Sequence, residues 1–209
     1  MKTKALVSAL AIAGLAVSPA SGDVILTGIL DGDLSGGDPK AIELYVSGTE
    51  DLADFDLERA ANDAIFDFSI GLSGTFTDEF VYIVNTSDLD DFEAIFGTTG
   101  DFANVITSTS ITGNGNDAFR IVEGTTVIDQ ISTGGVVEYA DGFLYRVDGT
   151  GPDGGFVIGN FTSGSVDGLD ITEYAATVPF GTYAIPEPAS LGLLAAGGLL
   201  LAGRRRRNG

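Results

Sequence analysis

The sequence predicts an all-β protein, a β-sandwich with one short helix, between two terminal signal segments. Short apolar runs rich in Val, Ile, Phe, Tyr and Thr alternate with clusters of Gly, Asp and Asn, the pattern of strands joined by tight turns. Each end of the chain carries an apolar segment beside basic residues. The stretch between them, residues 23–184, is long enough for one domain with its own core.

The N-terminus has the pattern of a secretory signal peptide. Two lysines precede an apolar run at residues 5–17, and small residues follow that run. We therefore expect residues 1–22 to form a signal helix that is removed on export. Cleavage after Ala20 and cleavage after Gly22 both satisfy the small-residue requirement.

Nine strands are expected in the domain, with a weaker tenth at residues 155–160. The nine span residues 24–30, 41–46, 55–59, 64–70, 80–84, 104–108, 117–122, 126–131 and 142–147. Two segments have the residues of tight turns, which require positive φ angles. Residues 113–116 are Gly and Asn, and the short link at residues 123–125 contains Gly.

Alternation within the second strand assigns its faces. Because successive side chains of a strand point to opposite sides, Ile42, Leu44 and Val46 share one face, and Glu43 and Tyr45 share the other. We expect the first of these faces to be core.

One helix is expected at residues 87–97. Its apolar face carries Leu89, Phe92, Ile95 and Phe96. Ser87 and Asp90 have the spacing of a capping box, and Gly97 can end the helix in the left-handed conformation. We expect the apolar face to close one end of the sandwich.

Five short motifs follow one another in an order that resembles the lamin-tail domain, an immunoglobulin-like β-sandwich common in secreted bacterial proteins. They are IELY at 42–45, DFDL at 54–57, FVYIV at 80–84, GNDAFRI at 115–121 and VIDQI at 127–131. The resemblance covers residues 24–160 and implies an immunoglobulin-like fold. Val46 and Phe55 depart from that family, which often has Asn and Trp at these places. A generic β-sandwich or a jelly roll is the alternative.

The C-terminus combines a rigid tripeptide, an apolar run and a cationic stop. These are Pro186-Glu187-Pro188, residues 189–203, and Arg204, Arg205, Arg206 and Arg207. As a helix the apolar run would reach about 22 Å, short of the roughly 30 Å hydrocarbon core of a bilayer. Arginine side chains can extend to the interface and favour the cytoplasmic side. We therefore expect a marginal transmembrane helix at residues 189–203.

This arrangement, over residues 185–209, closely resembles the PEP-CTERM sorting signal of Gram-negative bacteria that make exopolysaccharide. The resemblance implies that an exosortase in the inner membrane recognises Pro186, Glu187 and Pro188, cleaves nearby and releases the domain to the cell surface or extracellular matrix. Extracellular polysaccharide or a matrix protein is then the expected partner. A simple C-terminal membrane tail is the alternative.

The domain is strongly acidic. Residues 23–184 hold 4 basic and 29 acidic residues, a formal charge of −25. Such a field repels nucleic acid and anionic membranes and favours divalent cations and cationic partners. We expect no nucleic-acid partner, and a solvated acidic surface without a specific partner is the simpler alternative.

The chain has no Cys and no His. Disulfides, cysteine nucleophiles, Ser-His-Asp triads and most catalytic zinc sites are thereby excluded. We expect a non-catalytic protein, with a secreted hydrolase that acts on matrix polysaccharide through carboxylates as the alternative. Asp129, expected to face solvent or its hairpin partner, has no second carboxylate at a defined spacing to support that alternative.

A candidate calcium loop lies between the first two strands. Residues 31–38 read DGDLSGGD, and the first six match the opening of an EF-hand loop. The twelfth position is Ile42 in place of an acidic ligand, and a strand follows in place of a helix. The candidate ligands for Ca²⁺ are Asp31, Asp33, Ser35 and Asp38. An acidic turn is the alternative.

Overall fold

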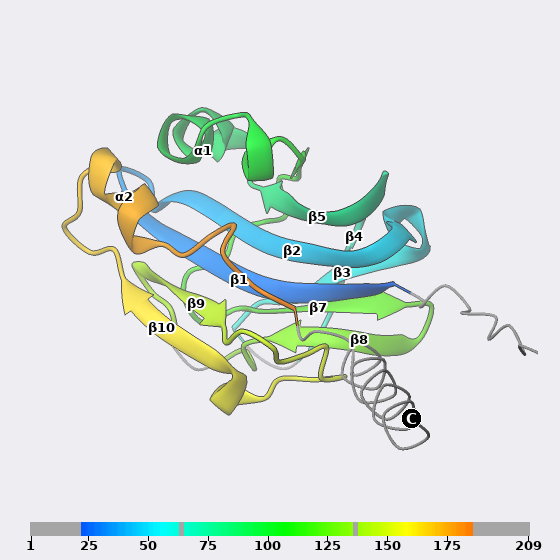
Figure 1. Ribbon diagram of the computed structural model, residues 1–209. Helices are drawn as coiled ribbons and strands as arrows, with labels where there is room; N and C mark the ends of the chain where they lie inside the picture. Colours follow the sequence, from blue (N-terminus) through cyan, green and yellow to red (C-terminus); the bar gives the residue numbers. More distant parts are fainter. Residues whose placement is uncertain (1–21, 63–64, 136–137, 186–209) are drawn as a thin grey trace, which may run out of the picture.

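A computed structural model of the chain describes residues 22–62, 65–135 and 138–185 (Figure 1). In chain order the strands and α-helices of this part are β1 Asp23–Leu34, β2 Asp38–Asp51, β3 Phe55–Ala60, β4 Phe68–Gly71, β5 Thr75–Val84, α1 Leu89–Phe96, β6 Val105–Thr107, β7 Ala118–Glu123, β8 Thr126–Ile131, β9 Gly142–Arg146, β10 Phe161–Ser165 and α2 Ile171–Thr177. Short 3₁₀ turns lie at Leu52–Asp54, Thr86–Asp88, Gly100–Phe102 and Ile158–Asn160.

The strands form two sheets that lie one above the other (Figure 1). The larger sheet has the order β10-β9-β1-β2-β5-β6, and the smaller has the order β4-β3-β7-β8. Neighbouring strands are antiparallel, except that β5 and β6 run parallel. A mostly β fold with two sheets and short helices confirms the predicted fold class at that level.

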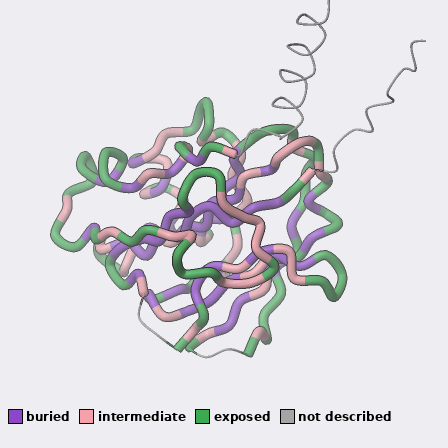
Figure 2. Tube along the Cα trace, turned by 60° about the horizontal axis from the view of Figure 1, so that its bottom comes forward, coloured by how far each residue is buried: buried purple, intermediate pink, exposed green. Residues whose placement is uncertain are grey.

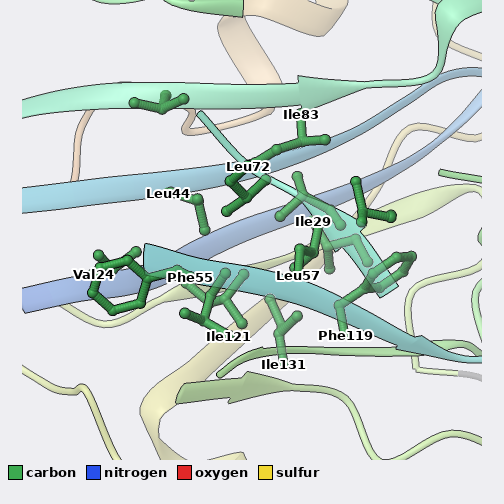
Figure 3. Close-up of a cluster of buried hydrophobic side chains, with 14 of the residues drawn as sticks. Val24, Ile29, Leu44, Phe55, Leu57, Leu72, Ile83, Phe119, Ile121 and Ile131 are labelled. Atoms are coloured by element: carbon green, nitrogen blue, oxygen red, sulfur yellow. The ribbon is translucent and has the colours of Figure 1, made fainter. Parts of the chain in front are cut away.

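The inner faces of the two sheets enclose the main hydrophobic core. Figure 3 shows Ile29 and Leu44 of the larger sheet facing Leu57, Phe119 and Ile121 of the smaller one. The alternation predicted for β2 is correct, because Ile42, Leu44 and Val46 all belong to this cluster. Burying each aliphatic side chain of this kind contributes about 1.5–3 kcal/mol.

A second core covers the outer face of the larger sheet. Both helices lie on the side of β2 and β5 that faces away from the smaller sheet (Figure 1). Phe92 of α1 is fully buried beside Tyr82 of β5, and Tyr174 of α2 is fully buried in the same cluster. The central strands are therefore buried on both faces, and the buried residues run along them in Figure 2.

The helix prediction was right in position and wrong in three details. The apolar face of α1 covers the outer face of the sheet and does not close an end of the sandwich. Ser87 does not cap the helix, which begins after Asp88 without a side-chain cap. Gly97 ends it with φ +90° and ψ −173°, outside the left-handed helical region.

Two strand predictions were displaced, and α2 was not predicted. The segment expected as a strand at residues 155–160 is a glycine-containing loop and a 3₁₀ turn, because pairing with β9 begins at Phe161 opposite Arg146. The fourth strand covers Phe68–Gly71 in place of residues 64–70. The start of α2 is a capping box formed by Asp170 and Glu173.

A buried ion pair joins the two sheets. Arg146 of β9 donates to the Asp129 carboxylate of β8 at 2.5 Å, and both side chains are fully buried. Asp129 also accepts the Leu26 N–H at 2.9 Å, while Arg146 donates to the Leu26 C=O at 2.7 Å. The expectation that Asp129 faces solvent or its hairpin partner was wrong. Its side chain lies between the sheets, because the buried N–H and C=O of Leu26 in β1 need hydrogen-bond partners there.

Loss of this carboxylate should destabilise the fold strongly. Burial raises the pKa of Asp129, and Arg146 opposes that rise. In Asp129→Asn the buried guanidinium keeps Asp153 but loses the fully buried one of its two charged partners, and we expect a loss of about 3 kcal/mol in the free energy of unfolding. The control is Glu58→Gln, which breaks the partly exposed pair with Arg120 and should cost less than about 1 kcal/mol. Urea unfolding at pH 7 measures both, and equal losses would contradict this assignment.

Candidate functional site at the C-terminal junction

Residues 178–185, here called the C-terminal strap, follow α2 and cross the outer face of the larger sheet (the orange segment after α2 in Figure 1). The helix ends at Thr177, where the Val178 N–H still bonds to Tyr174. Pro179 follows, and its ring lacks the N–H that a further helical turn would need. The chain then turns at Gly181, whose φ of +75° favours glycine.

The strap is hydrogen-bonded to a buried carboxylate. Glu43 of β2 is fully buried on the outer face of the sheet. It accepts hydrogen bonds from the Gly181 N–H at 2.5 Å, the Thr27 hydroxyl at 2.7 Å and the Tyr82 hydroxyl at 2.9 Å. Burial raises its pKa to about 7 from 4.5, although these hydrogen bonds act in the opposite direction. The junction thus contains an acid that titrates near neutral pH.

The next residues of the strap are bound through their backbone. The Tyr145 hydroxyl of β9 accepts the N–H groups of Thr182 at 3.1 Å and Tyr183 at 2.7 Å. The Asp148 carboxylate accepts the Ala184 N–H at 2.9 Å, and the Gly149 N–H donates to the Ala184 C=O at 2.9 Å. Domain contacts therefore continue as far as Ala184.

Aromatic side chains anchor the strap from beneath. Phe180 is buried and packs against Tyr82 and Phe96, with ring centroids 5.6 and 5.5 Å away. It lies over Gly28, where an added Cβ would come within 2.6 Å of the Phe180 ring. Tyr183 is buried beside Tyr45 and donates its hydroxyl to the Thr150 C=O at 2.8 Å.

The last two residues of the strap, 184 and 185, are the first two of a known motif. Residues 184–207 match the PEP-CTERM protein-sorting motif. The chain therefore carries a sorting signal that implies processing by an exosortase, export through the membrane and sorting to the cell surface. Comparison with curated proteins and with solved structures gave no match.

The predicted terminal signals lie outside the described residues. This applies to the signal helix before Gly22, to Pro186-Glu187-Pro188, to the membrane segment at residues 189–203 and to Arg204–Arg207. Among the residues that the structure describes, no helix has the length and apolar character needed to cross a membrane. The membrane helix stays a prediction.

The four candidate calcium ligands lie along a β-hairpin. Asp31 of β1 pairs with Lys40 of β2, and the Asp33 carboxylate accepts the Gly168 N–H at 2.6 Å. Ser35 lies in the turn, while Asp38 begins β2 opposite Leu34. No group of three or more acidic side chains that could hold a metal ion occurs in the described part of the chain. The sequence left a calcium loop and an acidic turn as alternatives, and the contacts of Asp31 and Asp33 favour the acidic turn.

An open pocket lies elsewhere, at the edge strand β10. Its volume is about 180 Å³, and it is lined by Glu138, Leu144, Phe156, Ile158, Phe161 and Ser163. The rings of Phe156 and Phe161 are 5.5 Å apart, and Ile158 at the rim is 73% exposed. One Glu138 carboxylate oxygen is buried without a hydrogen-bond partner among the described residues. The pocket is apolar with a single acidic acceptor.

Sequence reasoning placed Glu43 on the correct face but did not identify its role. The signal was the uninterrupted apolar run at residues 80–84, since a strand without alternation is buried on both faces. That run implied a covering layer over Glu43. No comparable sequence pattern indicated that Tyr145 and Asp148 bind the strap.

Substitution of Glu43 should change how stability depends on pH. The folded-state pKa lies above the unfolded one, so stability is fully present below pH 4.5 and decreases as the pH rises through 7. The wild type should therefore lose about 3 kcal/mol, relative to Glu43→Gln, between pH 4.5 and pH 7.5. Denaturant unfolding across this range measures the difference. Parallel stability curves would show that Glu43 does not titrate as stated.

The hairpin contacts also yield a prediction about cations. Because Asp31 is held by Lys40 and Asp33 by Gly168, we expect calcium and magnesium chloride at equal ionic strength to raise the melting temperature equally. Thermal unfolding with each salt measures this. A larger rise with calcium that Asp33→Asn abolishes would instead support the calcium loop.

Proposed function

We propose that this protein is a non-catalytic component of the cell surface or extracellular matrix of a Gram-negative bacterium. It is exported with the signal at residues 1–22 and held in the inner membrane by residues 189–203. It is then processed by an exosortase at Pro186-Glu187-Pro188. The observation that carries the proposal is the sorting motif at residues 184–207, joined to the folded domain by the strap.

A non-catalytic role is supported by the state of the buried carboxylates. Asp129 and Asp153 both bind Arg146, at 2.5 and 2.7 Å, so this pair of acids is engaged in an ion pair. Glu43 is covered by the strap. The hydrolase alternative requires two carboxylates that face a substrate across a cleft, and neither group offers that arrangement.

We further propose that the sandwich is immunoglobulin-like and related to lamin-tail domains, as the order of its strand motifs suggests. Its partner is an extracellular polysaccharide of a biofilm or matrix. The open pocket at β10 is the candidate contact, since the apolar faces of sugar rings pack on aromatic side chains and their hydroxyls can donate to Glu138. The charge of −25 favours a neutral chain over a polyanion.

Processing is tested with a variant of the tripeptide. Replacing Pro186, Glu187 and Pro188 by Ala should leave the protein membrane-bound, because the enzyme loses the residues that it recognises. Glu123→Gln, at the exposed end of β7, should be processed like the wild type. Mass spectrometry of surface material from an exosortase-containing host distinguishes them. Surface protein that still carries Arg204–Arg207 would contradict the proposal.

Polysaccharide binding is tested with the processed protein recovered from the cell surface. We expect it to sediment with a neutral matrix polysaccharide without shortening it, and Ile158→Ser to weaken retention about tenfold by removing a rim contact. The control is Ile171→Ser, on α2 and outside the pocket. Release of sugar oligomers would favour the hydrolase alternative, and equal retention of both variants would place the contact elsewhere.

A further inference from the structure

We propose that the open pocket at β10 binds an amino sugar, a hexosamine unit whose free, protonated amine binds Glu138. This inference rests on the polysaccharide binding proposed above and deepens it by naming the sugar that the pocket selects. The polysaccharide that carries this unit is uncharged elsewhere along its chain.

The pocket contains an acid without a counter-charge. Glu138 is one of six lining residues, and none of the six is basic. One of its carboxylate oxygens accepts the Thr133 hydroxyl at 3.1 Å, while the other is buried without a hydrogen-bond partner among the described residues. Such an oxygen costs free energy that a ligand recovers by supplying a donor. The pocket therefore lacks a hydrogen-bond donor, and a positively charged one suits it best.

The arginine beside the pocket is bound elsewhere. Arg146 lies over the Phe161 ring, 4.5 Å from its centroid. Its guanidinium donates to Asp129 and Asp153, so it supports the ring without offering the pocket a free cation. In the described part of the chain, no ion pair joins Glu138 to a basic residue.

The backbone at Glu138 is anchored to the domain. The Glu138 N–H donates to the Gly115 C=O at 2.8 Å. The next residue, Tyr139, is buried and donates its hydroxyl to the Asp117 C=O at 2.9 Å. The carboxylate is therefore held at the pocket before a ligand arrives, which lowers the entropy cost of binding.

Two aromatic rings form the apolar part of the pocket. Phe156 and Phe161 are half-buried, with centroids 5.5 Å apart. The C–H face of a sugar ring can pack on them, and an ammonium group is also attracted to an aromatic face. The volume of about 180 Å³ is below the roughly 300–1,000 Å³ of pockets for drug-sized ligands, so it suits one ring of a chain.

An amine satisfies Glu138 better than the other groups of a sugar. A hydroxyl is an uncharged donor, whereas an ammonium group makes charge-assisted hydrogen bonds that are about twice as strong. An acetylated amine has a single uncharged N–H, and its carbonyl oxygen is a second acceptor beside the carboxylate. The pocket therefore favours the free amine over both.

The charge of the whole domain acts in the same direction without being specific. Residues 23–184 carry a formal charge of −25, which attracts any cation to the surface. A test of the pocket must therefore separate Glu138 from this general field.

The first test compares two soluble hexamers of the same β-linked sugar, one of glucosamine and one of N-acetylglucosamine. Each is titrated into the purified full chain in detergent at pH 6, where the glucosamine amines are protonated, so the result does not depend on processing. We expect the glucosamine hexamer to bind about tenfold more tightly, measured by calorimetry. Equal affinities would overturn the inference and leave the proposed function standing. If neither hexamer binds, the inference and the polysaccharide contact at β10 are both wrong.

A matched pair of variants assigns the preference to Glu138. We expect Glu138→Gln to lose the tenfold preference and to keep the affinity of the wild type for the N-acetylglucosamine hexamer, which also shows that the pocket is intact. The control Glu123→Gln removes the same charge at the exposed end of β7, outside this pocket, and should keep the preference. A preference that survives in Glu138→Gln, or that falls equally in both variants, would show that the amines respond to the general field and would overturn the inference.

The ring contact is tested separately. Phe156→Leu should weaken the binding of both hexamers, because the sugar face packs on the ring whether or not the amine is acetylated. Unchanged affinity for both would place the sugar outside this pocket and overturn the inference.

A lysine side chain of a partner protein is the other cation that could reach Glu138. Hexalysine has the same net charge as the glucosamine hexamer and serves as its probe. We expect hexalysine to bind the wild type and Glu138→Gln alike, because it lacks a ring to pack on the aromatic side chains. An affinity for hexalysine that equals that of the glucosamine hexamer and depends on Glu138 would overturn the assignment to an amino sugar.

Discussion

The structure depends on a β-bulge in the central strand β1. The register with β2 shifts between Leu26 and Gly28, so that Thr27 is an extra residue. A bulge in a strand buried on both faces leaves polar groups that need internal partners. On the inner side Leu26 is bound by Asp129 and Arg146, which tie β8 and β9 to β1.

On the outer side the same bulge turns the Thr27 hydroxyl toward Glu43. Glu43 then also binds the Gly181 N–H, and the neighbouring Gly28 leaves the space that Phe180 fills. The β-bulge thus links two sets of contacts: the Asp129–Arg146 ion pair between the sheets, and the hydrogen bond from the strap to Glu43. The sorting motif begins at the end of that strap, so it follows a segment that is bound to the domain rather than a free linker.

The all-β class, most strand positions and α1 could be predicted from sequence, because alternation, turn residues and a helical apolar face are local patterns. The strand at residues 126–131 was predicted with its observed bounds. The predicted strand at residues 155–160 failed because pairing with β9, a long-range contact, decides where β10 starts. Asp129 was misplaced for a related reason, since a carboxylate in an alternating strand gives no sign of a buried arginine that lies 17 residues away.

By itself the sequence determined the sorting motif, the acidic charge and the absence of Cys and His chemistry, all of which depend on residue identity and spacing alone. Only the tertiary structure decided that both faces of the larger sheet are buried and that Glu43 binds the chain just before the motif. The physical reason is that a buried polar group is defined by its partners. Thr27, Glu43, Tyr145 and Gly181 are far apart in the chain and come together only when the sheet and the strap have assembled.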